Sequence, residues 1–192
     1  MMIKIIHRVN TIEALKGIPN EYGVEIDVRG NEGQLVLGHD FGIYKDKFDE
    51  FIKHFQHKLL VVNIKEAGVE QQVLDSLKKE SISNFFLLDI EFPYLLQNHE
   101  HFGNYLSLRF SKFESVYNLP SFTDKVKWVW VDTYKDFDLD SESADILRNF
   151  QLCLVSPSRW GFENKMNYYI EKFAKYEIVF DAVMVDKSEV LI

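Results

Sequence analysis

Residues 24–40 read Val-Glu-Ile-Asp-Val-Arg-Gly-Asn-Glu-Gly-Gln-Leu-Val-Leu-Gly-His-Asp. The first five residues alternate apolar and acidic side chains, which is typical of a strand with Glu25 and Asp27 on one face. A stretch rich in glycine and polar residues follows, and then a second apolar run, residues 35–37. The sequence therefore predicts a strand and a short hairpin that carries Gly38-His39-Asp40 back over the end of that strand.

Seven further segments have the apolar, β-branched and aromatic character of strands. With Val24–Val28, the expected strands are Ile3–Arg8, Leu59–Lys65, Phe85–Glu91, Tyr105–Phe110, Lys127–Asp132, Gln151–Ser156 and Ala182–Asp186. Amphipathic stretches lie between most of them, with helices expected near Thr11–Lys16, Asp46–Phe55, Val69–Leu77, Pro93–Asn98, Lys112–Tyr117, Ser141–Asn149 and Met166–Phe173. Such alternation predicts a parallel sheet. Eight units without a glycine-rich dinucleotide motif favour the α/β class and a compact (β/α)8 TIM barrel with a short hairpin after strand 2.

Length and composition limit the class of protein. The 192 residues, 46% of them hydrophobic, predict a single folded domain over residues 1–192. The formal charge of −8 argues against nucleic-acid binding and against docking on an anionic membrane. No apolar run is long enough for an integral membrane segment, and the start of the chain lacks the pattern of a signal peptide. With a single cysteine, Cys153, the sequence predicts a cytoplasmic protein.

Polar residues recur where the expected strands end. They form pairs two residues apart on successive strands, and single residues end the last two: Glu25 and Asp27, Asn63 and Lys65, Asp89 and Glu91, Ser107 and Arg109, Trp130 and Asp132, Ser156, and Asp186. In a barrel the carboxyl ends of the strands meet at one mouth, where the active sites of this fold lie. Charges buried there bind a ligand or a metal, or pair with one another in a purely structural network.

Several of these motifs together resemble the glycerophosphodiester phosphodiesterase family. The matching elements are His7-Arg8 at the first strand end, the segment Asn10–Leu15 after it, Glu25-Ile26-Asp27, and His39-Asp40 after the hairpin. The match spans residues 6–65; beyond it, the strand rhythm and the ending 181–186 are similar to the family. Phosphatidylinositol-specific phospholipase C and sphingomyelinase D share this barrel chemistry.

The resemblance implies a division of roles for cleaving a phosphodiester. His7 and His39 are the expected acid and base, because the ordinary pKa of histidine lies near neutrality. Lys65 joins them as a catalytic residue, and it and Arg8 are expected to hold the phosphate. Glu25 and Asp27 are expected to bind Mg²⁺ or Ca²⁺. The substrate is expected to be a small-molecule glycero-, polyol- or sugar-phosphodiester, cleaved by hydrolysis or through a cyclic phosphate.

Each role has a plainer alternative. Glu25 and Asp27 can instead pair with Arg8, Arg29 or Lys65 without a metal. Asn10 is expected to do no more than cap a helix, with Glu13 three residues on.

The match is incomplete at one ligand position. Family members usually carry an acidic residue two before the lysine, where this chain has Asn63. An amide oxygen can coordinate these cations but neutralises no charge, so Glu91 or Asp89 is a candidate for the missing carboxylate. A catalytically weak or inactive barrel that binds a phosphorylated ligand is therefore the main alternative, and an isomerase or aldolase using Lys65 is a third.

The opposite side of the mouth is expected to bind the rest of the substrate. The candidates are Arg109, Trp130, Asp132 and Ser156, together with Arg159-Trp160. Trp130 offers an apolar face for a sugar ring and Arg109 a site for an anion. The alternative for Trp128 and Trp130 is a place in the core or under the helices.

Overall fold

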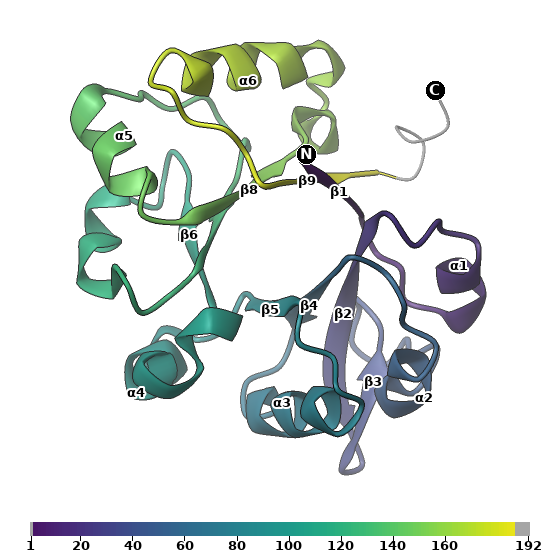
Figure 1. The fold of residues 1–192 in the computed structure, drawn as a ribbon. Helices are drawn as coiled ribbons and strands as arrows, with labels where there is room; N and C mark the ends of the chain where they lie inside the picture. Colours follow the sequence, from purple (N-terminus) through teal and green to yellow (C-terminus); the bar gives the residue numbers. More distant parts are fainter. Residues whose placement is uncertain (1, 187–192) are drawn as a thin grey trace.

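The computed structural model describes residues 2–186, which form a nearly closed barrel of eight parallel strands surrounded by helices (Figure 1). The barrel strands are β1 (Ile3–Ile6), β2 (Gly23–Asn31), β4 (Leu59–Ile64), β5 (Phe85–Leu88), β6 (Ser107–Phe110), β7 (Trp128–Val131), β8 (Gln151–Val155) and β9 (Ala182–Val185). They pair in the order β5-β4-β2-β1-β9-β8-β7-β6. The predicted (β/α)8 TIM barrel is therefore confirmed.

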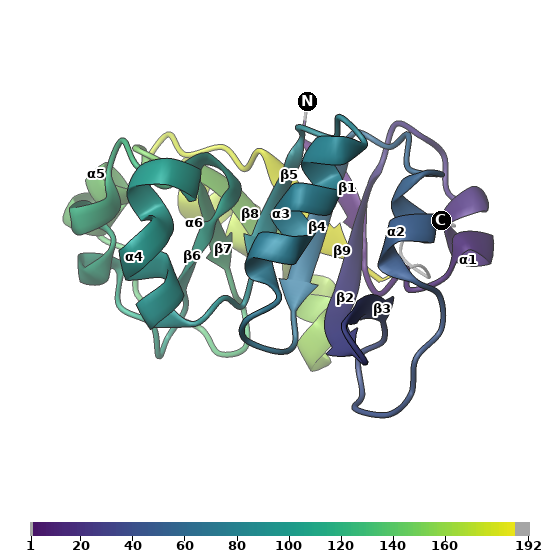
Figure 2. The same ribbon diagram turned by 90° about the horizontal axis from the view of Figure 1, so that it is seen from below.

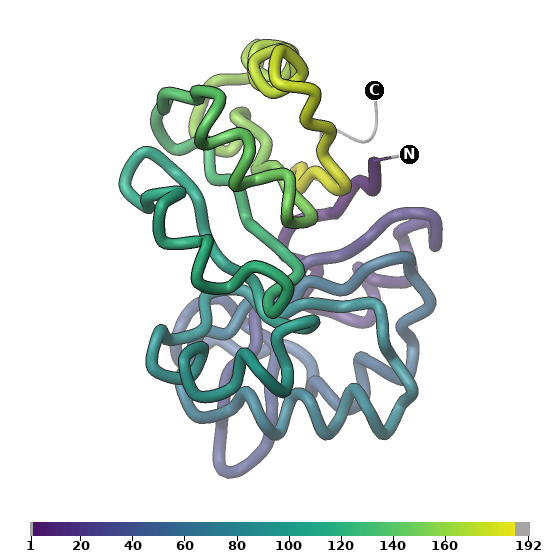
Figure 3. Tube along the Cα trace, turned by 60° about the vertical axis from the view of Figure 1, so that its left-hand side comes forward, coloured from purple at the N-terminus to yellow at the C-terminus, as the bar shows by residue number. Residues whose placement is uncertain are grey.

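The ring is closed unevenly. The first and last strands pair in parallel along Ile3–Ile6 and Ala182–Val185, which brings the beginning and end of the described chain side by side (Figure 3). Between β5 and β6, a single isolated bridge joins Leu87 to Leu106 within residues 2–186. Ser107 Oγ also donates a hydrogen bond to the Leu87 carbonyl at 2.8 Å. The thinnest backbone seam of the barrel thus lies between β5 and β6.

Helices line the outside of the barrel, as the side view also shows (Figure 2). They are α1 (Ile12–Lys16), α2 (Phe48–Ile52), α3 (Glu70–Lys79), α4 (Phe92–Phe102), α5 (Ser141–Leu147) and α6 (Met166–Ala174). Short 3-10 turns cover Gly103–Tyr105, Val116–Asn118, Pro120–Phe122, Pro157–Trp160 and Glu163–Lys165. Among the described residues, no helix is long and apolar enough to cross a membrane.

The helix expected over Lys112–Tyr117 is wrong. Ser111 Oγ donates to Glu114 at 2.7 Å and accepts from the backbone N–H of Phe113 at 3.2 Å. Such bonds between side chains and nearby backbone compete with helix formation. The chain therefore makes a tight turn after β6, and only Val116–Asn118 forms a 3-10 turn.

Strand alternation divides the apolar side chains between two cores. One set fills the barrel interior: Ile5, Leu59, Val61, Phe86, Leu88, Trp128, Trp130, Cys153, Val155, Ala182 and Met184. The intervening residues, among them Val24, Ile26 and Leu60, pack under the helices. Trp128 and Trp130 belong to the inner set, where the Phe86 ring stacks on Trp128 with centroids 4.8 Å apart.

The hairpin after strand 2 is confirmed. Strand β3 (Gln34–Leu37) pairs antiparallel with the end of β2 and projects from one end of the barrel (Figure 2). At Gly38 a Cβ atom would collide with the carbonyl oxygen of Ile43. Glycine therefore lets the following loop fold back closely, and this fold sets the position of His39.

Candidate active site

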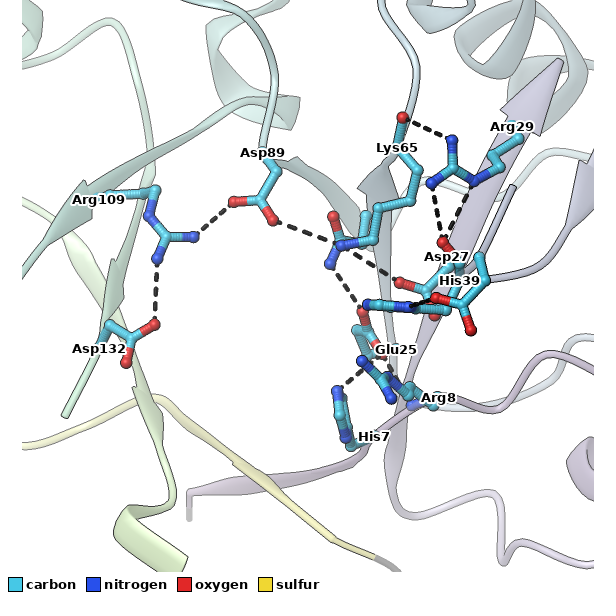
Figure 4. A network of polar contacts seen from close by, with 12 residues as sticks. His7, Arg8, Glu25, Asp27, Arg29, His39, Lys65, Asp89, Arg109 and Asp132 are labelled. Atoms are coloured by element: carbon cyan, nitrogen blue, oxygen red, sulfur yellow. Dashed lines mark hydrogen bonds and ion pairs between the residues drawn. The ribbon is translucent and has the colours of Figure 1, made fainter. Parts of the chain in front are cut away.

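A cavity of about 190 Å³ opens at the carboxyl ends of the barrel strands. Its lining includes all but two of the site residues predicted from the sequence: His7, Arg8, Glu25, Asp27, His39, Asn63, Lys65, Asp89, Arg109, Trp130, Asp132, Arg159 and Trp160. Figure 4 shows polar side chains from several strands joined by hydrogen bonds and ion pairs, among them Lys65 with Asp27 and Asp89, and Arg109 with Asp89 and Asp132. The sequence pattern of polar strand ends thus corresponds to one physical site.

Three oxygen-bearing side chains form the acidic part of the cavity. Glu25 and Asp27 alternate with the outward-facing Ile26 on β2, and Asn63 is the register partner of Asp27 on β4. Glu25 and Asp27 are each 1% exposed and Asn63 is 8% exposed. Two carboxylates are therefore held side by side with almost no access to water.

Glu25 is held by two hydrogen bonds. Its Oε2 accepts from the backbone N–H of Arg8 at 2.8 Å, and its Oε1 accepts from Asn63 Nδ2 at 3.1 Å. Arg8 adopts a positive φ of 56°, in the turn that follows the end of β1. Burial, and then the charge of Asp27, raise the pKa of Glu25 to about 7.

Asn10 binds Asp27 rather than capping the first helix. Its Nδ2 donates to Asp27 Oδ2 and its Oδ1 accepts from the Asp27 backbone N–H, both at 2.8 Å. The N-cap of α1 is Thr11, whose Oγ1 accepts from the Ala14 N–H at 3.0 Å. The capping role predicted for Asn10 is therefore wrong by one residue, and Asn10 orients a carboxylate of the site.

The oxygens of this cluster fit a hard divalent cation. Asp27 Oδ1 and Asn63 Oδ1 are buried, and neither accepts a hydrogen bond from any described residue. The nearest positive charge to Asp27 Oδ1 in this cluster is Lys65 Nζ, an ion-pair partner at 3.5 Å. Buried oxygens that accept no hydrogen bond, beside a carboxyl whose pKa is raised, are what a bound cation would stabilise. No group of three or more His, Cys, Asp or Glu within residues 2–186 is arranged to hold a metal. A cation bound by Glu25 and Asp27 would therefore have the amide oxygen of Asn63 as its third protein ligand.

His7 lies between two carboxylates. Its Nδ1 is 3.0 Å from Asp186 Oδ1, and its Nε2 is 4.0 Å from Glu25 Oε2. Burial lowers the pKa of His7, and the nearby Arg159 lowers it further, while the hydrogen bond with Asp186 opposes both. An aspartate at Nδ1 favours the tautomer with its proton on that nitrogen, which leaves Nε2 free to accept one.

His39 has a similar partner in a more open position. Its Nδ1 is 2.7 Å from Asp40 Oδ1, and the His39 side chain is 38% exposed. Arg29 holds the loop that carries His39. Its Nη2 donates to the His39 carbonyl at 2.8 Å, and its Nη1 donates to the Lys65 carbonyl at 3.1 Å. Among the described residues Arg29 thus ties His39 to the end of β4 and does not pair with the buried acids.

Lys65 provides a positive charge next to the acidic cluster. Its Nζ lies 3.5 Å from Asp27 Oδ1 and 3.8 Å from Asp89 Oδ2. These contacts make Lys65 a counter-ion of the site. They give no support to its use as the amine of an aldolase.

A second network lies across the mouth. Arg109 binds Asp89, Glu114 at 2.6 Å and Asp132 at 3.1 Å. The bond to Asp89 crosses the thin β5–β6 seam (Figure 4). Arg109 thus has three acidic partners in the structure, and its contact with an anionic part of the substrate stays a prediction.

Asp132 and Trp160 continue that network outward. The indole Nε1 of Trp160 donates to Asp132 Oδ1 at 2.9 Å, and the Tyr134 N–H donates to the same oxygen at 3.1 Å. Trp130 is only 4% exposed, whereas Trp160 is 37% exposed. The aromatic surface that a ligand can reach is therefore Trp160, and Trp130 forms part of the cavity floor.

Two predicted site residues lie outside the cavity lining, Glu91 and Ser156. Strand β5 ends at Leu88, and Asp89 has a positive φ of 58°, so the alternation expected over Asp89 and Glu91 fails. Asp89 turns toward Lys65, while Glu91 is exposed at the start of α4. Ser156 is 1% exposed, and its Oγ lies 2.7 Å from Ser158 Oγ.

Several contributors had a weak signal in the sequence or none. The sequence places Asp186 at a strand end but indicates no partner for it, and it favours a capping role for Asn10. Nothing in the local pattern marked Glu114 or the loop contacts of Arg29. Their roles depend on distances between segments far apart in the chain.

The fold is similar to that of a solved enzyme. The crystal structure of a glycerophosphodiester phosphodiesterase from Agrobacterium tumefaciens str. C58 superposes with a TM-score of 0.62, covering 96% of each chain, at 11% sequence identity. No family model matches the sequence, and no curated protein matches it. This similarity shows the TIM-barrel fold.

Proposed function

We propose that this protein is a phosphodiesterase that cleaves a small-molecule phosphodiester with the assistance of a divalent cation. One observation carries the proposal: His7 and His39 line the same cavity, each with an aspartate at its Nδ1. An imidazole oriented in this way can exchange a proton through Nε2. Two such groups at one cavity meet the need of phosphodiester cleavage for a base and an acid.

His7 suits the role of base. Burial lowers its pKa, so that neutral imidazole prevails at neutral pH. A substrate hydroxyl next to the phosphate gives its proton to His7 as its oxygen bonds to phosphorus. His39, more exposed, gives a proton to the departing oxygen as its bond to phosphorus breaks. The products are a cyclic phosphodiester and an alcohol, and water can then open the ring.

Glu25, Asp27 and Asn63 would hold Mg²⁺ or Ca²⁺. When bound, the cation would neutralise charge on the phosphoryl oxygens. The protein supplies the rest: Asn10 fixes Asp27, the Arg8 N–H fixes Glu25, and Lys65 adds positive charge. The exposed Arg8 side chain, beside His7, would contact the phosphate.

The similarity to the Agrobacterium enzyme supports the class of reaction, and the departure at Asn63 is the reason to consider a second function. A barrel with two carboxylates instead of three holds a cation more weakly. If that loss is complete, the protein binds a phosphorylated ligand without cleaving it. We also propose that the protein is cytoplasmic, as expected from its single cysteine.

Hydrolysis of bis(p-nitrophenyl) phosphate with added Mg²⁺ or Ca²⁺ tests whether the protein cleaves diesters at this site. This diester has no neighbouring hydroxyl, so water would be the nucleophile. His7→Ala and His39→Ala should each reduce the rate by about 10²–10⁴-fold. His54→Ala, at an exposed histidine outside the cavity, is the matched control. Undiminished turnover in either cavity variant would remove the two histidines from the mechanism.

A further inference from the structure

Of the four lysine and arginine side chains in the cavity lining, two have acidic partners and two do not. Lys65 lies between Asp27 and Asp89, and Arg109 binds three carboxylates. Within residues 2–186, no hydrogen bond or ion pair joins the guanidinium of Arg8 or of Arg159 to another residue. In a chain with a net charge of −8, two unpaired arginines at one cavity need an explanation.

Arg159 lies in a turn that is held in place by hydrogen bonds. It lies in the 3-10 turn Pro157–Trp160, where its N–H donates to the Ser156 carbonyl at 3.1 Å. The next residue, Trp160, is fixed to Asp132 by its indole N–H at 2.9 Å. The guanidinium carbon of Arg159 lies 5.7 Å from the centroid of the Trp160 ring. Such support reduces the conformational entropy lost when the guanidinium binds an anion.

The single negative charge of a phosphodiester suggests different roles for Arg8 and Arg159. A phosphodiester carries one negative charge, and Arg8, beside His7, is placed to bind it. Arg8 lies in the turn after β1, whereas Arg159 lies in the turn after β8, beside Trp160, and both line the cavity. A diester bound at Arg8 would leave the guanidinium of Arg159 available for a second anionic group.

We infer that Arg159 binds a second anionic group of the substrate, so that the preferred substrate is a phosphodiester that also carries a carboxylate or a phosphomonoester. This inference rests on the proposed phosphodiesterase function and specifies its substrate class. A guanidinium recognises either anion through two parallel hydrogen bonds. The exposed Trp160 face beside it would contact the linker between the two charges.

Two matched pairs of diesters test the inference and separate the two anions. Glycerophosphoserine differs from glycerophosphoethanolamine by a carboxylate, and glycerophosphoinositol 4-phosphate differs from glycerophosphoinositol by a phosphomonoester. In at least one pair, the wild-type kcat/KM should be about tenfold or more higher for the more anionic member. Arg159→Gln should bring that ratio close to one, and Arg159→Lys should restore part of it.

Lys165→Gln removes the same charge from the same loop outside the cavity lining, and it should leave the ratio as in the wild type. Equal kcat/KM values within both pairs would overturn the inference while leaving the phosphodiesterase proposal in place. If the protein shows no turnover, binding of the same diesters can be measured by calorimetry in a His39→Ala background. Absence of turnover with a binding preference that depends on Arg159 would reject only the phosphodiesterase proposal. Equal binding within both pairs would overturn the Arg159 assignment.

Discussion

His7 Nδ1 lies 3.0 Å from Asp186 Oδ1, although the two residues are separated by nearly the whole chain. Parallel pairing of β1 with β9 brings them together at the mouth of the barrel. Because the hydrogen bond fixes the imidazole, Asp186→Asn should reduce kcat on the order of 100-fold. The Asp186 charge raises the pKa of His7, so its loss should also shift the acidic limb of the pH–rate profile to lower pH.

Nitrogen NMR of the His7 ring can separate this positioning role from a loss of folding, because it reports the tautomer directly. Asp138→Asn, at an exposed carboxylate away from the cavity, is the control for a general charge effect. An Asp186→Asn protein with the wild-type tautomer and rate would contradict the assignment.

The raised pKa of Glu25 predicts how stability depends on pH without metal. In the unfolded chain this carboxyl loses its proton near pH 4.5, and in the folded protein near pH 7. The folded state therefore binds more protons between these values, and its stability falls as pH rises through them. The loss should be about 3 kcal/mol and complete slightly above pH 7.

Urea unfolding from pH 4 to 8 measures this effect in the wild type and in Glu25→Gln. The amide cannot ionise, so the difference between the two curves should increase up to about pH 7. Mg²⁺ or Ca²⁺ should stabilise the wild type most above pH 7, since it binds the ionised carboxylate. Parallel curves for the two proteins would show that Glu25 has an ordinary pKa.

Asn63→Asp tests the interpretation of the acidic cluster as a weakened cation site. The change supplies a third carboxylate and should increase Mg²⁺ or Ca²⁺ affinity by about tenfold or more. Without metal it should destabilise the fold by about 2–4 kcal/mol, because it adds a buried charge and removes the hydrogen bond to Glu25 Oε1. Calorimetric metal titration and thermal unfolding measure the two effects. Unchanged metal affinity would count against a cation site here.

Adjacent residues Asn10 and Thr11 offer a matched comparison. Asn10→Ala removes both hydrogen bonds to Asp27 and should weaken cation binding and lower activity by roughly tenfold. Thr11→Ala removes the cap of α1 and should cost about 1 kcal/mol of stability with little effect on activity. The reverse pattern, measured by unfolding and by diester hydrolysis, would return Asn10 to a capping role.

The sequence predicted the features that depend on local pattern. Alternation over residues 24–28 and the polar run after it predicted β2, the hairpin and the convergence of Glu25, Asp27 and His39. These features follow from the two-residue period of a strand and from turn chemistry. Each can be read from a few consecutive residues.

The failures have physical causes that lie outside a local pattern. The left-handed backbone at Asp89 turns its side chain to Lys65 and moves Glu91 out of the site. Asn10 has the composition of a cap, but a carboxylate on the next strand competes for its amide. The three carboxylates around Arg109 come from separate segments, so no local pattern indicates them. Pairings of this kind are decided by tertiary contacts.

Phosphorus NMR of the wild-type protein with glycero-, inositol- and sugar-phosphodiesters tests the central claim most directly. Mg²⁺ and Ca²⁺ are supplied in separate samples, and His39→Ala is measured beside the wild type. The account predicts that at least one diester signal is replaced by that of a cyclic phosphate or a phosphomonoester, and that this conversion is abolished in His39→Ala. Diester signals that stay unchanged with either cation would contradict it, and would leave a barrel that binds phosphorylated ligands without cleaving them.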